Sequence, residues 1–206
     1  MERKNNYLIQ AAQAKQRFLT YDQQKLIGKF ALEADANDLY VRLLGQRYRI
    51  CRASGSLEKQ TAEGWVDGNT YEEVMTLLDL LCDSREDRWL TLRWKNMQSF
   101  GLMFHQNLLE DQRDSYADRF SGDLEGFCLA CEALGGTPLP QGDAAYAIEL
   151  FDGLCIALQL WLGDEEFPAR LRFLWDENAL MYLKYETMYF ARALLLRRLE
   201  KIMQNA

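Results

Sequence analysis

The sequence predicts an α+β protein with a mostly antiparallel sheet of five to seven strands, packed against several helices that include a long C-terminal helix. Two hairpin signals, Gly45-Gln46 and Asp152-Gly153, each join segments in which apolar and polar residues alternate. Other segments repeat apolar residues every three to four positions, which is the helical period. We expect a single domain over residues 1–206, because a chain of this length can still build one core.

The first quarter of the chain predicts helices followed by a hairpin. Residues 5–19 read as a helix whose apolar stripe is thin, so we expect this helix to be peripheral. A second short helix follows Asp22. From Leu39 the period changes to two, and Gly45 suits the first central position of a two-residue II′ turn.

The middle of the chain predicts one strand between helices. The sequence Thr70-Tyr71-Glu72-Glu73 is a capping box, which indicates a helix that runs to about Cys82. Residues 89–94 can form a strand. Residues 104–120 and 123–134 predict two more helices, and the second of them ends at a pair of glycines.

The last third of the chain predicts three consecutive antiparallel strands and a helix. Residues 143–151 and 154–162 flank Asp152-Gly153, and residues 170–175 alternate apolar with polar side chains. Because residues 154–162 are apolar on both faces, we expect them to form a central strand. A helix over residues 186–203 ends the chain.

Composition excludes several classes of protein. The formal net charge of −7 opposes general binding to nucleic acid, since contacts from Lys and Arg to phosphate dominate that affinity. No secretory signal is evident, and no apolar run reaches the roughly 20 residues of a membrane span. The five cysteines cannot all pair with one another, so we expect reduced thiols, a cytoplasmic protein and no membrane partner.

A cluster of arginines is predicted on one face of the first hairpin. If Gly45 and Gln46 form the turn, Arg42 faces Arg49 and Tyr40 faces Cys51. Three arginines and a tyrosine then share one surface, opposite a buried apolar face. Such a surface suits a phosphate or a carboxylate, although it can equally be a solvated face paired with acidic residues. The candidate anion-binding residues are Tyr40, Arg42, Arg47 and Arg49.

A cluster of acidic residues is predicted at one end of the second hairpin. Counting back from the turn places Asp143 opposite Leu162, beside the loop that precedes the next strand. The cluster can hold a divalent cation, supply a general acid and base, or simply decorate a solvated turn. Its members are Asp143, Asp164, Glu165, Glu166 and the nearby Arg170. Asp176 lies at the far end of the third strand, where we expect it to cap a short helix.

The remaining motifs imply no cofactor. Cys128-Leu129-Ala130-Cys131 is a lone C-x-x-C motif within a helical pattern, which favours buried thiols over zinc or an iron-sulphur cluster. The single histidine, His105, excludes every mechanism that requires two. The phosphate-binding loops typical of ATP and dinucleotide sites are absent from the sequence.

Three segments carry a resemblance to a known family. They are Gly142 to Tyr146, Leu160 to Pro168, and Trp175-Asp176 through Leu183. Across them the chain resembles the bacterial and archaeal family catalogued as domain of unknown function 3786, most strongly over residues 135–190. The resemblance implies no established activity. The family is typical of anaerobes, and some relatives have an added cysteine-rich, iron-sulphur-like segment, which this chain lacks.

These observations lead to three functional hypotheses. The leading one is a non-catalytic binding or interaction domain that recognises a small anionic ligand or a protein partner. The second is a metal-assisted, hydrolase-like enzyme that uses the acidic cluster. The third is a structural subunit that associates with another copy of itself through exposed apolar residues.

Overall fold

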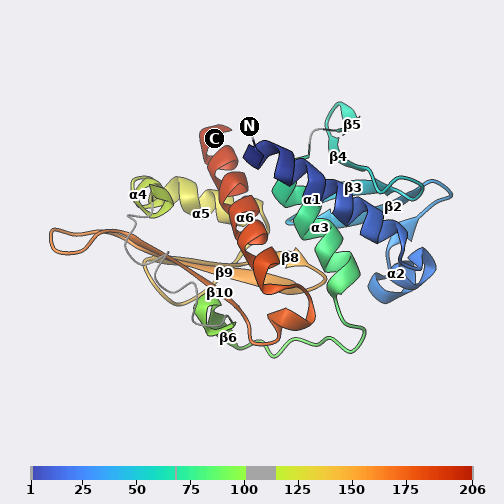
Figure 1. Ribbon diagram of the computed structural model, residues 1–206. Helices are drawn as coiled ribbons and strands as arrows, with labels where there is room; N and C mark the ends of the chain where they lie inside the picture. The colour runs from blue at the N-terminus through green and yellow to red at the C-terminus, as the bar shows by residue number, and fades with distance from the viewer. Residues whose placement is uncertain (1, 68, 101–114, 206) are drawn as a thin grey trace. The chain divides into compact units, whose positions relative to one another are not determined.

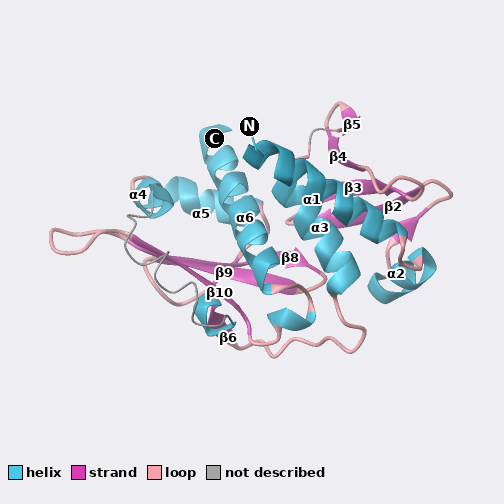
Figure 2. Cartoon of the chain, viewed as in Figure 1, coloured by secondary structure: helices cyan, strands magenta, loops and turns pink. Residues whose placement is uncertain are grey.

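The computed structural model describes residues 2–67, 69–100 and 115–205, and it confirms the predicted fold class (Figure 1). Helices and antiparallel strands are both present, and α6 (Tyr185–Asn205) is the long C-terminal helix. Where we expected one sheet, the described strands form two antiparallel sheets of five strands each (Figure 2). The prediction therefore had the right class and the right antiparallel orientation, but the strands divide between two sheets.

The residues that we expected in one domain cluster into two compact units. The first unit contains residues 1–89 and 181–191, and the second contains residues 90–180 and 192–206. Both units take part of α6. Each unit has its own sheet, and we describe them separately.

The sheet of the first unit follows the order of the chain. Its strands are β1 (Glu33–Ala34), β2 (Asp38–Leu43), β3 (Gln46–Cys51), β4 (Leu57–Thr61) and β5 (Gly64–Val66). The buried side chains predicted for the first hairpin are confirmed, since each is at most 4% exposed. They are Leu39, Val41, Leu43, Tyr48 and Ile50.

The turn of the first hairpin lies one residue earlier than predicted. Leu44 and Gly45 are its central residues, with φ of 48° and 75°, so Leu43 pairs with Gln46. Positive φ at both positions is the conformation of a I′ turn, whose twist matches the flanking strands. Positive φ is unfavourable for leucine, and burial of Leu44 to 1% exposure compensates for this cost.

Three helices and the start of α6 complete the first unit. They are α1 (Glu2–Leu19), α2 (Gln23–Phe30) and α3 (Tyr71–Asp83). The capping box is confirmed, since the Thr70 hydroxyl accepts the Glu73 N–H and the Glu73 carboxylate accepts the Thr70 N–H. Helix α1 packs against α3, and its Phe18 is fully buried. Residues 7–9 of α1 are exposed, as expected of a peripheral helix.

The sheet of the second unit has β9 at its centre. From one edge to the other its strands are β6 (Trp94–Asn96), β10 (Arg170–Asp176), β9 (Leu154–Trp161), β8 (Ala144–Phe151) and β7 (Thr137–Pro138). The predicted central position of β9 is confirmed, and most of its side chains are buried. Helices α4 (Ser115–Ser121) and α5 (Leu124–Ala133) pack against this sheet.

The second hairpin has the predicted turn but a different register. Asp152 and Gly153 both have positive φ, and Phe151 pairs with Leu154 as predicted. A bulge between Glu149 and Phe151 then shifts the pairing by one residue, so Ala144 lies opposite Leu160. Counting back from the turn assumed a regular ladder, and the predicted pairing of Asp143 with Leu162 was therefore wrong.

Two predictions in the middle of the chain need correction or lie outside the described residues. Residues 89–93 are not a strand, because Leu92 adopts a φ of 58° that interrupts extended structure, and β6 begins only at Trp94. Of the helix predicted over 104–120, the described part is the end that α4 covers. His105 lies outside the described residues.

Candidate functional site

The predicted arginine face is present on the first sheet, with a corrected register. Arg42 pairs with Arg47 and Tyr40 pairs with Arg49, where we had predicted Arg42 opposite Arg49 and Tyr40 opposite Cys51. Both registers place these four side chains on one surface, because directly paired residues point to the same side of a sheet. We use the term arginine face for Tyr40, Arg42, Arg47, Arg49 and Trp65.

Carboxylates from neighbouring segments neutralise two of the three guanidinium groups. Arg47 forms an ion pair of 2.5 Å with Glu33, and Arg49 pairs with Glu58 on the adjacent strand. The hydrogen bond to Glu58 raises the pKa of Arg49. These two arginines therefore match the alternative that the sequence left open, a face paired with acidic residues.

Arg42 differs from the other two arginines of the face. Its guanidinium donates one hydrogen bond of 3.4 Å to the carbonyl of Gly45 in the turn, and its side chain is exposed. Among the residues that the structure describes, no carboxylate lies within ion-pair distance of it. Arg42 thus presents a positive charge that the neighbouring segments do not neutralise.

Two aromatic rings fix the arginines in place. The Arg47 guanidinium lies 4.9 Å from the ring centre of Tyr40, and that of Arg49 lies 5.1 Å from the ring centre of Trp65. The two rings are 5.8 Å apart. The Tyr40 hydroxyl donates to Asp35 over 2.8 Å, and this bond raises the pKa of Tyr40. Cations over aromatic faces and charge-assisted hydrogen bonds hold these side chains in defined positions.

Sequence reasoning missed Trp65 and the two carboxylates of this face. Trp65 lies on the short strand β5, which we did not predict, although Gly64 after Thr61-Ala62-Glu63 was an available turn signal. Glu33 and Glu58 come from β1 and β4, which were not predicted either. Their pairing with the arginines depends on the order of the strands.

In the predicted acidic cluster, Asp143 and Asp164 each accept backbone N–H groups of the loop between β9 and β10. The Asp143 carboxylate accepts the Leu162 N–H over 2.7 Å, and that of Asp164 accepts the N–H groups of Glu166 and Phe167. These bonds to backbone lower the pKa of Asp164. Glu165, Glu166 and Arg170 are exposed around them.

The described side chains of the acidic cluster are not arranged as a metal-binding group. Over residues 2–67, 69–100 and 115–205, no three His, Cys, Asp or Glu side chains are arranged to hold a metal ion. One carboxylate oxygen of Asp143 and one of Asp164 accept backbone N–H groups. The metal-assisted hypothesis therefore stays a prediction.

Asp176 has a larger role than the helix cap that we expected. Its carboxylate is buried and accepts the Asn178 N–H over 2.8 Å, which is the predicted kind of contact at the start of a helical turn. It also accepts the N–H groups of Thr91 and Leu92. Asp176 therefore anchors the loop that precedes β6 to the end of β10.

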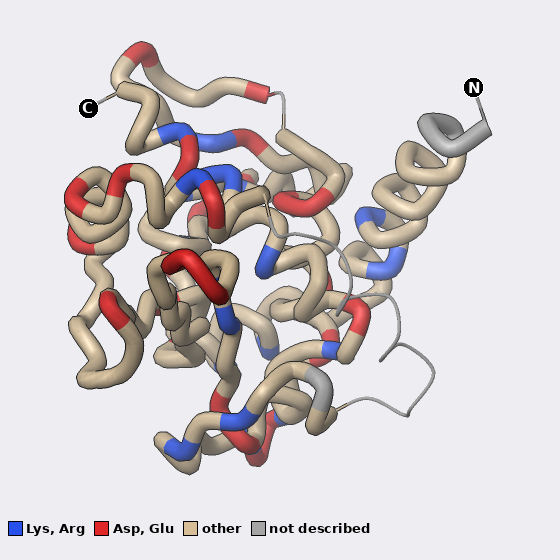
Figure 3. Tube along the Cα trace, turned by 90° about the vertical axis from the view of Figure 1, so that its left-hand side faces the viewer, with Lys and Arg blue, Asp and Glu red and all other residues tan. Residues whose placement is uncertain are grey.

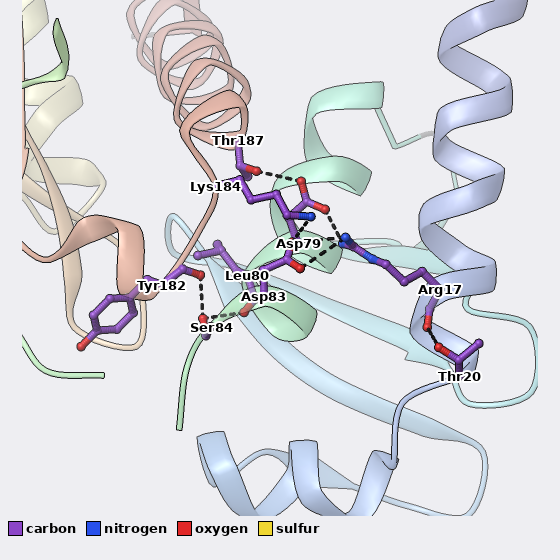
Figure 4. A network of polar contacts seen from close by, with 9 residues as sticks. All are labelled: Arg17, Thr20, Asp79, Leu80, Asp83, Ser84, Tyr182, Lys184 and Thr187. Carbon is purple, nitrogen blue, oxygen red and sulfur yellow. Dashed lines mark hydrogen bonds and ion pairs between the residues drawn. The ribbon is translucent and has the colours of Figure 1, made fainter. Parts of the chain in front are cut away.

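A second polar cluster, the helix network, joins three helices inside the first unit (Figure 4). Arg17 of α1 contacts Asp79 of α3 at 2.5 Å, and the Thr187 hydroxyl of α6 donates to the same carboxylate at 2.8 Å. The ammonium of Lys184 lies 3.2 Å from Asp83, which also contacts Arg17. No local pattern in the sequence predicts this network, because its members are far apart in the chain.

Burial controls the protonation of Asp79. Its side chain is only 7% exposed, and this desolvation raises the pKa of Asp79 against the opposing effects of Thr187 and Arg17. The charge of Asp83 acts in the same direction as burial. Buried carboxylates with raised pKa values occur in active sites and in structural networks alike. Here every described contact of Asp79 links helices, so we interpret the network as structural.

Glu73, on the same helix, shows the opposite behaviour. Burial acts to raise the pKa of Glu73, but hydrogen bonds from the Tyr48 hydroxyl and the Thr70 N–H, with the charge of Lys59, lower it. The Tyr48 bond is 2.6 Å long and joins β3 to α3. The contact therefore fixes α3 across the buried side of the sheet that carries the arginine face.

The cysteines do not form a candidate site. None of the five forms a disulfide, and Cys131 is fully buried within α5. Burial raises the pKa of Cys131 and, to about 12, that of Cys82. Protonated buried thiols fit the prediction of small apolar core residues.

Charged residues of both signs are interspersed along the described chain (Figure 3). Every helix in the described part of the chain is too short or too polar to span a membrane.

Comparison with known proteins identifies one family. The family described as a domain of unknown function (DUF3786) matches residues 22–198. No curated protein and no solved structure matches the chain.

Proposed function

The chain belongs to the DUF3786 family, and we propose that it is a non-catalytic binding domain that recognises a small anionic ligand through the arginine face. The observation that carries this proposal is the exposed Arg42 guanidinium, which is without a carboxylate partner among the described residues. A guanidinium binds carboxylates and phosphates through two parallel hydrogen bonds.

The rest of the arginine face supports binding by preorganisation. Arg47 and Arg49 are held by carboxylates and by aromatic rings, so little side-chain entropy is lost when a ligand contacts them. Trp65 is half-buried at the edge of the face and offers a flat apolar surface. The face therefore suits a ligand whose carboxylate or phosphate is attached to a planar group, with the charge at Arg42 and the ring near Trp65.

The experiment is a thermal-melt screen of the full chain against phosphorylated and carboxylate metabolites. A ligand at 100 times its dissociation constant stabilises a protein by about 2.7 kcal/mol. In a chain of this size such a gain raises the melting temperature by several degrees. We expect at least one planar anion to produce this shift in the wild type.

Two variants assign the shift to a surface. Arg42→Ala should abolish it, whereas Arg170→Ala, which removes an exposed arginine from the other sheet, should preserve it. A screen without any stabilising anion, or an equal loss of the shift in both variants, would contradict the proposal. Retention of the shift in Arg42→Ala would do the same.

A cytoplasmic location is part of the same proposal. It is supported by the five cysteines, all of which are free thiols, as is usual in a reducing compartment.

A further inference from the structure

The second unit exposes two large apolar side chains with charges of opposite sign beside them. Leu92 is 80% exposed and Phe167 is 66% exposed, more than any other large apolar side chain described in this unit. Single exposed apolar residues are common on protein surfaces. Here one is flanked by acidic residues and the other by basic residues, which indicates surfaces that can bind one another. Each belongs to a small patch with a defined structure.

The first patch, which we name the acidic tip, is the loop between β9 and β10. It contains Leu162, Asp164, Glu165, Glu166 and Phe167. Hydrogen bonds from the N–H groups of Glu166 and Phe167 to Asp164 hold the loop in one conformation, and Asp143 holds its base. The tip therefore presents Phe167 and a negative charge together, and it extends beyond the ends of the strands (Figure 1).

The second patch, which we name the basic edge, precedes and includes β6. It contains Leu92, Arg93, Trp94 and Lys95, which are all exposed. Asp176 fixes its start through the Leu92 N–H at 2.7 Å. Arg93 and Lys95 share the single carboxylate of Glu177, and the Asp176 carboxylate beside them is buried, so the two cations are the exposed charges of the patch itself. In the sheet formed by the described strands, β6 is an edge strand, and edge strands are common sites of association.

The two patches lie at opposite ends of one strand. Residue 170 of β10 adjoins the acidic tip, and Asp176 pairs with Trp94 of the basic edge. The seven residues of β10 place roughly 20 Å between them, at about 3.3 Å per residue. The acidic tip of one chain therefore cannot reach the basic edge of the same chain.

We propose that two copies of this chain associate, with the acidic tip of each docking on the basic edge of the other. Phe167 would then pack with Leu92 and Trp94, while Glu165 and Glu166 pair with Arg93 and Lys95. Two copies related by a two-fold axis make both contacts at once, since the patches of each copy lie at the two ends of one strand. This surface lies on the second unit and is distinct from the arginine face.

The test is the mass of the full chain by sedimentation, with reversal of the charges on each patch. The wild type should sediment at about twice the chain mass of 24.0 kDa. Glu165→Lys with Glu166→Lys should give a monomer, and so should Arg93→Glu with Lys95→Glu. All four substitutions in one chain should restore the dimer, because the charges are again complementary.

The restored dimer separates lost association from lost folding. Lys201→Glu, a reversal of an exposed charge on α6, is the matched control and should leave the dimer intact. A wild type that remains monomeric, or a dimer that survives either reversal, would overturn the proposal. Failure of the combined variant to dimerise would overturn it as well.

Discussion

The first unit pairs arginines with carboxylates in two places, and the two places differ in burial. In the helix network, Arg17 meets Asp79, whose side chain is 7% exposed, and three helices contribute to the cluster. On the arginine face, Arg47 meets Glu33, whose side chain is 68% exposed. Ion pairs between arginine and a carboxylate therefore have different roles at the two places. A buried pair ties elements together, whereas an exposed pair orients side chains at little gain in stability.

The comparison predicts that substitutions in the helix network affect stability, whereas substitutions on the arginine face affect binding. In the network, removal of one partner leaves the largely buried carboxylates of Asp79 and Asp83 without compensation. On the face, water replaces the missing partner. Substitutions at the two places test this contrast directly.

The largest effect is expected for Arg17→Met, which keeps most of the apolar stem and removes the charge. Of the cations described in the network, Lys184 beside Asp83 would then remain to compensate the two carboxylates. We expect a loss of about 3 kcal/mol in the free energy of unfolding, the low end for a buried pair, because Arg17 is 31% exposed. Denaturant unfolding measures this loss.

Arg17→Lys is the matched control for this change. It retains the positive charge but not the forked geometry, and it should lose less than half as much stability. If Arg17→Met unfolds at the same denaturant concentration as the wild type, the network is not structural and the contrast with the arginine face fails.

A smaller, pH-dependent effect is expected at Glu73. Because its pKa is lowered in the folded protein, its stabilisation is complete above about pH 4.3, the ordinary value for an unfolded glutamate. The stabilisation is lost as the pH falls through the folded pKa. Glu73→Gln should therefore be less stable than the wild type at pH 7, by about 1 to 3 kcal/mol, and the two should converge in acid.

Melting curves between neutral pH and pH 3 test the sign of this effect. Glu63→Gln, at an exposed position in the turn between β4 and β5, is the matched control and should follow the wild type. A constant difference between Glu73→Gln and the wild type across this range would show that Glu73 acts through packing and not through its charge.

The smallest effect on stability is expected for Arg49→Ala on the arginine face. In the removed ion pair the Arg49 and Glu58 side chains are 31% and 34% exposed, so solvent screens it in part. We expect the free energy of unfolding to stay at the wild-type value within the error of denaturant unfolding. A large loss of stability would instead make the face a structural element and remove the contrast with the helix network.

Local signals in the sequence predicted the elements whose causes are local. The capping box at Thr70 and the turn at Asp152-Gly153 are both confirmed, because each depends on residues within four positions of one another. The residues that share a face of the first hairpin were also predictable. The turn lies one residue earlier than predicted, which shifts each cross-strand pairing by two residues and so leaves every side chain on its predicted face.

Tertiary packing decided the features that the sequence did not predict. Leu44 adopts a positive φ, which is unfavourable for leucine, and the burial of its side chain compensates for this cost. The bulge before Phe151 shifts the strand register from the one obtained by counting back from the turn. Trp65, Glu33 and Glu58 join the arginine face only through the order of the strands. No periodicity in the sequence reports which strands become neighbours.

The central claim is that Arg42 binds a ligand and does not stabilise the fold. Titration calorimetry of the best anion from the screen into the wild type and into Arg42→Ala tests it most directly. We predict heat of binding with the wild type and none with Arg42→Ala, while the two proteins unfold at the same denaturant concentration. Equal affinity of the two proteins for the anion would contradict the claim.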